Sequence, residues 1–172
     1  MYNDVYYITT REENVYILDK ELLFQSEFFK TTIEGDKEEK NIRIEHLNDE
    51  VFIRVLEFMT YHKNKVPSII KKPIKHENMI DNVNDPWDAW FIDDVDNNPK
   101  LLYKLIETAN YLDIQPLLDL ACCKVATFGL NVHPSEYAKL LGTPIKILTE
   151  DDERMISEDL KWIKTERSLN IN

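Results

Sequence analysis

The chain has 172 residues, a hydrophobic content of 43% and a formal net charge of −11 at neutral pH. This length and composition suit one soluble globular domain with or without an extension. The negative charge disfavours direct binding to nucleic acid, because the phosphate backbone would be repelled. No run of about 18 apolar residues predicts a membrane span, and the start lacks the basic and then apolar pattern of a secretory signal.

The first third of the sequence predicts a small sheet with helices. Two runs of β-branched and aromatic residues, 5–8 and 15–18, flank a polar turn and indicate a hairpin. Ser26 precedes a short apolar segment as a helix cap would. A third short strand is expected over 41–44. Asn48 then caps a helix in which apolar residues recur at helical spacing.

Residues 62–97 are predicted to form a variable, partly disordered loop. The part up to residue 84 carries five lysines and two prolines and has little periodicity. We interpret it as a solvated loop, with a basic patch for acidic partners as the alternative. Trp87, Trp90 and Phe91 predict that the end of the loop is held against the domain.

From residue 100 onward the pattern is helical. Apolar residues recur at helical spacing as far as Leu112, and a second helix begins around Pro116. The second helix is apolar on almost every side, which predicts burial all round, in part by another element or by a partner. Beyond it, we expect a short helix from Pro134 and a last helix after Thr149, where Thr149 and Asp152 suggest a capping box.

The residue types that carry out chemistry are poorly placed for it. Cys122 and Cys123 are adjacent in an apolar run, so we expect two buried, reduced thiols in an intracellular protein. The four histidines are scattered, which makes a zinc site improbable. We expect no cofactor and no catalytic residues, and the sequence favours a binding protein over an enzyme.

The hexapeptide ANYLDI at residues 109–114 lies at the expected joint between two helices. Tyr61-His62-Lys63 stands before the lysine-bearing segment and Trp87-Asp88 after it, and Pro134 and Trp162 follow in order. Together these residues resemble the S-phase-kinase-associated (Skp) adaptor family of SCF (Skp–cullin–F-box) ubiquitin ligases. The segment 62–84 bears lysines where that family is commonly acidic.

The resemblance implies an α/β (α+β), mainly helical fold. Residues 1–128 would form a BTB/POZ domain, a small sheet flanked by helices, and residues 129–172 a helical extension that binds F-box motifs. The implied function is that of an adaptor between the N-terminal region of a cullin and F-box substrate receptors, in cytoplasm and nucleus, for ubiquitin-dependent degradation. The alternative is a BTB-type scaffold or self-associating protein that acts outside ubiquitin ligases.

The resemblance also implies binding residues. Asn110 and Tyr111 are the cullin-binding candidates. The alternative is that they have only a structural role, as a helix-end asparagine and a half-buried tyrosine. Pro134 is a candidate modification site. The F-box-binding candidates are apolar or aromatic: Val125, Phe128, Tyr137, Leu140, Leu141, Ile156, Leu160 and Trp162. For each of them, internal packing is the alternative.

Overall fold

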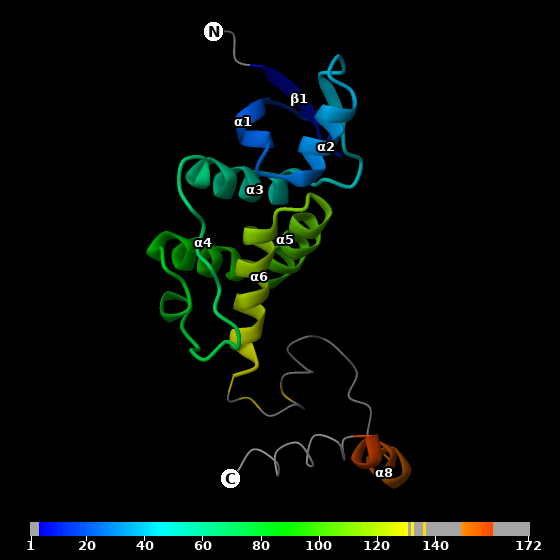
Figure 1. Cartoon of the computed structure of the whole chain (residues 1–172), viewed down its shortest axis with the longest axis vertical. Helices are drawn as coiled ribbons and strands as arrows, with labels where there is room; N and C mark the ends of the chain where they lie inside the picture. The colour runs from blue at the N-terminus through cyan, green and yellow to red at the C-terminus, as the bar shows by residue number, and fades with distance from the viewer. Residues whose placement is uncertain (1–3, 131, 133–135, 137–148, 160–172) are drawn as a thin grey trace, which may run out of the picture. The chain divides into compact units, whose positions relative to one another are not determined.

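The computed structural model describes residues 4–130, 132, 136 and 149–159 (Figure 1). The chain divides into two compact units, Met1–Asn131 and Val132–Asn172. Among the described residues, no helix combines the length and the apolar character needed to cross a membrane.

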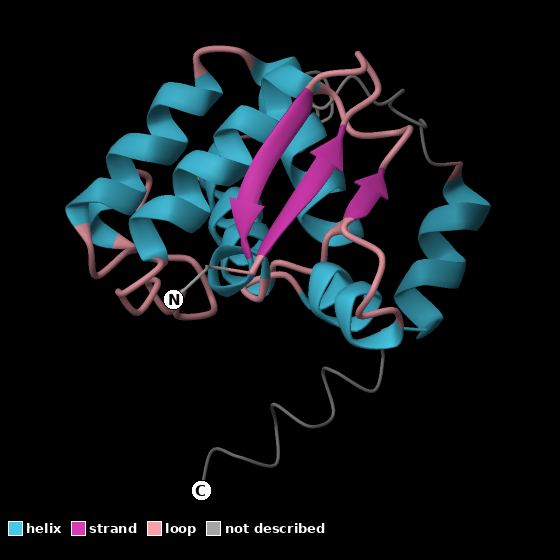
Figure 2. Cartoon of the chain, turned by 90° about the horizontal axis from the view of Figure 1, so that it is seen from above, coloured by secondary structure: helices cyan, strands magenta, loops and turns pink. Residues whose placement is uncertain are grey.

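A three-stranded sheet covers one side of the first unit (Figure 2). Strands β1 (Val5–Thr9) and β2 (Val15–Asp19) pair antiparallel, and β3 (Asn41–Arg43) pairs parallel to β1 on its other edge. The side chains of Tyr6 and Ile8 are buried, whereas Tyr7 between them is exposed, as the alternation of a half-buried strand requires. The predicted hairpin and third strand are confirmed.

The helices begin where the sequence supplies caps. The side chains of Ser26 and Asn48 accept hydrogen bonds from the first turns of α2 and α3. The elements of the first unit that follow β2 are α1 (Lys20–Leu23), α2 (Glu27–Gly35), α3 (Asp49–His62), the 3-10 turn η1 (Met79–Asp81), α4 (Pro86–Asp96), α5 (Pro99–Tyr111) and α6 (Gln115–Phe128). The α/β class with a small sheet and mainly helical content is confirmed.

Helix α4 corrects the prediction of a loop over 62–97. Asp85 caps this helix by accepting a hydrogen bond from the backbone of Trp87 at 2.9 Å. Phe91 and Ile92 are then completely buried. Sequence reasoning missed the helix because its apolar residues form a single short stripe between the lysine-rich segment and an acidic run. Trp90 contributes less than Phe91, since the residue is 57% exposed and its ring lies 6.4 Å from that of Trp87 between centroids.

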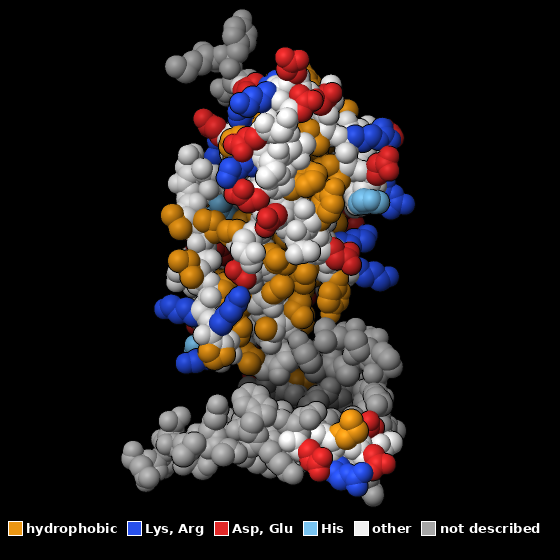
Figure 3. Space-filling model, turned by 45° about the vertical axis from the view of Figure 1, so that its right-hand side comes forward, with side chains coloured by type: hydrophobic (Ala, Val, Ile, Leu, Met, Phe, Trp, Pro, Cys, Tyr) orange, Lys and Arg blue, Asp and Glu red, His pale blue; other side chains and the backbone are white. Residues whose placement is uncertain are grey.

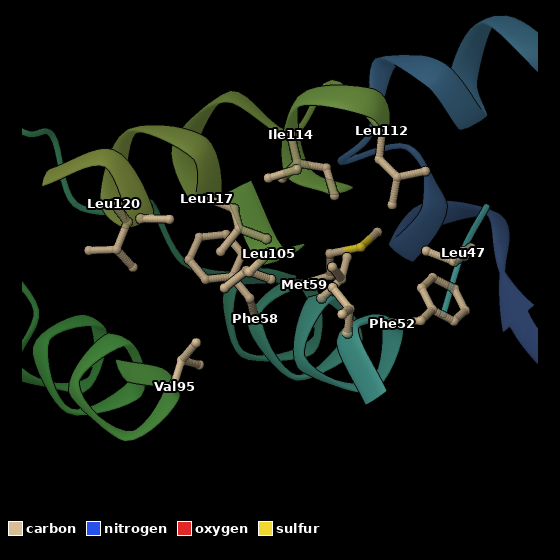
Figure 4. Close-up of a cluster of buried hydrophobic side chains, with 14 of the residues drawn as sticks. Leu47, Phe52, Phe58, Met59, Val95, Leu105, Leu112, Ile114, Leu117 and Leu120 are labelled. Carbon is tan, nitrogen blue, oxygen red and sulfur yellow. The ribbon is translucent and has the colours of Figure 1, made fainter. Parts of the chain in front are cut away.

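The core of the first unit lies between the sheet and helices α3, α5 and α6. Phe58 and Met59 of α3 meet Leu105 of α5 and Leu117 of α6 in one buried cluster (Figure 4). The ring of Tyr16 on β2 packs edge-on against Phe52 of α3, with 5.1 Å between ring centroids. The sheet is therefore fastened to the same helix that supports α5 and α6.

In the second unit, the structure describes α8 (Glu150–Asp159). The Thr149 hydroxyl accepts a hydrogen bond from the backbone of Asp152 at 3.2 Å, and the Asp152 carboxylate accepts one from the backbone of Thr149 at 3.0 Å. This reciprocal pair is the predicted capping box, with Asp in place of the more common Glu.

Candidate functional site

The joint between α5 and α6 has a defined geometry. After the last residue of α5, Asp113 adopts a φ of 50°. The backbone amide of Asp113 donates to the carbonyl of Asn110 at 3.2 Å, and that of Ile114 donates to the carbonyl of Ala109 at 2.9 Å. These two bonds form a Schellman motif, which satisfies carbonyls at the end of α5 and turns the chain within three residues.

The start of α2 holds this joint from the other side. The buried Ser26 hydroxyl donates a short hydrogen bond to the carbonyl of Leu112. The amides of Glu27 and Phe28 donate to the carbonyls of Asp113 and Leu112 at 3.3 Å and 3.4 Å. Unpaired amides at a helix start thus meet unpaired carbonyls at a helix end, where the partial charges are opposite. A contact between residues 86 positions apart therefore fixes the joint.

Asn110 and Tyr111 lie on the surface at this joint. The Tyr111 side chain is 47% exposed, and its ring contacts that of Phe28 with 5.0 Å between centroids. A hollow of about 230 Å³ lies beside the ring and is lined in part by His46, Leu47 and Tyr111 itself. An exposed aromatic ring held in place next to a hollow is well suited to contact another protein, because little side-chain freedom remains to be lost.

Helix α6 presents a second surface. Cys122 is exposed, and Val125 and Phe128 are half-buried. Lys124 forms ion pairs with Asp93 and Asp96 of α4 at 2.8 Å and 3.3 Å, which fasten the two helices together. The opposite side of α6 is buried in the core through Leu117, Leu120, Ala121, Cys123 and Thr127.

The predicted burial of α6 all round, in part by another element or by a partner, is met on one side of the helix in the described residues, whereas the expected burial of Cys122 is wrong. Helices α4 and α5 pack on one side of α6, and the other side remains partly exposed in the described structure. Although Cys122 as a whole residue is exposed, partial loss of solvent around its sulfur and the nearby charge of Asp119 raise the pKa of its thiol, and burial raises the pKa of Cys123. Both thiols are then protonated at neutral pH, which makes them poor nucleophiles.

The remaining sequence candidates belong to the second unit. Pro134, Tyr137, Leu140, Leu141, Leu160 and Trp162 lie outside the described residues. The backbone of Ile156 lies in α8. In the described part of the chain, no three His, Cys, Asp or Glu residues are grouped so as to hold a metal ion.

One pair of buried polar residues escaped the sequence analysis. His62 Nε2 and Asp88 Oδ1 are 2.7 Å apart, and both side chains are almost completely buried. The second Asp88 oxygen accepts a hydrogen bond from the backbone amide of Ser68 at 3.1 Å. Both residues stood among the sequence landmarks, but 26 positions separate them and no local pattern indicates that they touch. The pair joins the end of α3, the following segment and α4.

Comparison with known proteins agrees with this architecture. The model of the Skp1 family tetramerisation domain matches residues 5–64. The S-phase kinase-associated protein 1 homolog of Tetrahymena thermophila is 39% identical over 151 residues, which cover 88% of this chain and 89% of the relative. The chain belongs to the Skp1 family. The resemblance seen in the ANYLDI joint and its flanking residues is thereby confirmed.

Other relatives of Skp1 type are more distant. The SCF ubiquitin ligase complex protein SKP1a of Dictyostelium discoideum is 30% identical over 156 residues, covering 90% of this chain and 93% of its own. The E3 ubiquitin ligase complex SCF subunit sconC of Aspergillus fumigatus is 31% identical over 147 residues, covering 84% of this chain and 89% of its own. The likeness to the Skp1 family therefore extends over both units.

Proposed function

We propose that this protein is the adaptor subunit of an SCF-type ubiquitin ligase, bridging the N-terminal region of a cullin to F-box substrate receptors. Membership of the Skp1 family supports this, as do relatives that are named as SCF complex components. Such an adaptor makes and breaks no bonds itself. Its contribution is a high effective concentration of bound substrate near the ubiquitin-loading machinery.

The observation that carries the proposal is the presence of two partly exposed surfaces on one pair of packed helices, α5 and α6. Tyr111 lies at the joint before α6, and Val125 lies near the other end of α6. A helix rises about 1.5 Å per residue, so the ten steps from Gln115 to Val125 separate the surfaces by about 15 Å. The two surfaces therefore lie toward opposite ends of α6, and this arrangement suits an adaptor that contacts two partners.

The two surfaces take the two partners. We assign Asn110 and Tyr111 to cullin binding, since the Tyr111 ring is exposed and Phe28 holds it in place. We assign the open side of α6, with Val125 and Phe128, to the F-box motif. We assign to the same partner the apolar and aromatic candidates of the extension over 129–172, which are Tyr137, Leu140, Leu141, Ile156, Leu160 and Trp162, and we assign cullin binding to the domain formed by residues 1–128. Action in cytoplasm and nucleus and modification at Pro134 belong to the same proposal.

The test measures the two partners separately, with purified cullin N-terminal region and a purified F-box protein in a surface-binding assay. Tyr111→Ala should lower the affinity for cullin about thirtyfold or more and should leave F-box binding unchanged, because aromatic residues that become buried at the centre of an interface contribute about 2 kcal/mol or more. Phe128→Ala should do the reverse. Tyr103→Ala serves as the matched control, since Tyr103 is a similarly exposed tyrosine on α5.

Loss of both partners in either variant, with the fold intact by circular dichroism, would contradict the assignment of separate surfaces. Recovery from cells of further copies of this chain alone, without cullin or F-box proteins, would instead support the self-associating scaffold.

A further inference from the structure

The segment between α3 and α4 forms a basic hollow. Its volume is about 510 Å³. One wall carries Lys71, Lys72, Lys75 and His76, and the other is made by residues 81–84. Figure 3 shows Lys, Arg and His side chains beside apolar ones at the lower left of the unit that contains residues 4–130. We call the lining residues named above, Lys71, Lys72, Lys75 and His76 with residues 81–84, the basic hollow.

The charge of the hollow is opposite to that of the molecule. The chain carries a net charge of −11, whereas the hollow has three lysines and only Asp81 as a carboxylate. Among the described residues, Lys71 and Lys75 are paired with no carboxylate. Lys72 pairs with Asp119 at 3.2 Å, but its side chain is 73% exposed, so this pair contributes little stability. The three lysines outnumber the carboxylate of the hollow, so they repel one another, and a bound anion reduces that repulsion.

Hydrogen bonds hold both walls of the hollow. The Ser68 hydroxyl accepts from the amides of Asn84 and Asp85, at 3.0 Å each. The Asn82 side chain donates to the carbonyls of His76 and Asn78 at 2.7 Å and 2.9 Å. The hollow is therefore a feature of the fold, and it exists before any ligand binds.

The basic hollow lies next to the surface that we assign to the F-box motif. The ion pair between Lys72 and Asp119 places the segment against α6, and the two lie side by side in Figure 1. Asp119 and Val125 border the exposed side of α6, with Cys122 between them. Val125 follows Asp119 by six positions, which is about 9 Å along the helix axis.

We propose that the basic hollow binds an acidic segment of the same receptor whose F-box motif occupies α6. This rests on the proposed function and adds to it the chemistry of a second contact. Ile69 lines the hollow and is 70% exposed. We therefore expect the acidic segment of the receptor to carry apolar residues among its carboxylates. A polypeptide suits this surface better than a small anion does, because the hollow measures about 510 Å³ and apolar side chains, Ile69 and Val83, line it together with the lysines.

The first experiment uses the full chain and a fluorescent peptide that alternates Glu with Leu. The peptide should bind the unmodified protein, and raising the salt should weaken binding, since surface charges are screened. Lys71→Glu together with Lys75→Glu should lower the affinity about tenfold or more. The control, Lys37→Glu with Lys100→Glu, reverses two exposed lysines outside the hollow, and should stay within about twofold.

Two results would overturn the inference at this stage. One is equal binding of a peptide with Gln in place of Glu. The other is equal loss of affinity in the hollow variant and in the control, which would indicate that the acidic peptide is attracted by exposed lysines in general and not by a specific site.

The second experiment compares the proteins that co-purify from cells with the unmodified chain and with the Lys71→Glu/Lys75→Glu variant. We expect the variant to keep cullin and to lose those F-box proteins that bear an acidic segment beside the motif. Unchanged recovery of all receptors would overturn the inference and leave the proposed function standing. If the unmodified chain recovers neither cullin nor F-box proteins, the proposed function fails, and the assignment to a receptor fails with it.

Discussion

Asp88 and His62 share one buried hydrogen bond, and each depends on the other. Asp88 uses one carboxylate oxygen for His62 and the other for the amide of Ser68. His62 Nδ1 has no partner among the described residues, so the contact with Asp88 is the polar interaction that offsets the burial of the imidazole. Aromatic rings surround it, with Phe58 at 4.4 Å and Tyr61 at 5.0 Å between centroids. A buried polar group that loses its partner in such surroundings has no water to replace it.

Asp88→Ala should therefore destabilise the protein by about 3 kcal/mol, because removing one partner of a buried pair leaves the other uncompensated. Asp88→Asn keeps a hydrogen-bonding group and should cost less. Denaturation by urea, followed by circular dichroism, measures the difference in the free energy of unfolding.

Asp94→Ala is the control for this prediction on the same helix. Asp94 pairs with Arg54 at 2.7 Å, but its side chain is 38% exposed, so we expect a loss of about 1 kcal/mol or less. Equal losses for Asp88→Ala and Asp94→Ala would show that burial does not determine the strength of the His62–Asp88 pair.

Helices α2 and α5 stabilise each other end to end. The first amides of α2 have no partner within their own helix, and neither do the carbonyls of Leu112 and Asp113 that follow α5. Joining them satisfies both sets inside the protein, and Ser26 takes part twice: its hydroxyl accepts from the amide of Phe29 at 3.2 Å and donates to Leu112. Asp113 completes the joint with a positive φ, a conformation that is costly for most residues but is tolerated by Asp.

Ser26→Ala removes both hydrogen bonds at a buried position and should cost about 1–2 kcal/mol. Asn98→Ala, at the cap of α5, is the matched comparison. The Asn98 side chain accepts a longer bond of 3.4 Å from the amide of Leu101, and the residue is exposed. We therefore expect a smaller loss of about 0.5–1 kcal/mol. Shifts in the urea midpoint measure both, and a larger loss for Asn98→Ala would contradict the role given to Ser26.

At the scale of the whole molecule, the acidic side chains make stability depend on pH. A hydrogen bond from Lys63 lowers the pKa of Asp19, and one from the backbone of Trp87 lowers the pKa of Asp85. The Thr10 hydroxyl does the same for Asp49. Each carboxyl ionises more readily in the folded chain than in the unfolded chain. The stabilisation is thus complete above the ordinary pKa of 3.8 and is lost as the pH falls through the lower folded value.

We expect the thermal midpoint to fall as the pH drops below 3.8, the ordinary pKa of these carboxyls. Asp19→Asn removes one of the shifted groups and should make the acid decline less steep, even though the variant begins less stable. Thermal unfolding at a series of pH values tests this. A midpoint that rises on acidification, or an equally steep decline in Asp19→Asn, would contradict the linkage.

The sequence by itself was enough to predict the hairpin, the third strand, the caps at Ser26 and Asn48, and the two helices around the joint. It also indicated the family. These features depend on residues within a few positions of one another: alternation along a strand, apolar spacing along a helix, and polar caps. The ANYLDI joint belongs to this class, because a Schellman turn forms from consecutive residues.

Only the tertiary structure decided which surfaces remain exposed and which distant residues touch. Helix α6 is apolar on nearly every side, so its composition could not show which side the core covers; the packing of α4 and α5 determines that. The contacts of Ser26 with Leu112, His62 with Asp88 and Lys72 with Asp119 span 86, 26 and 47 positions. No local pattern encodes such contacts, because they form only when separate elements pack around one core. The same packing positions the two candidate binding surfaces and the basic hollow.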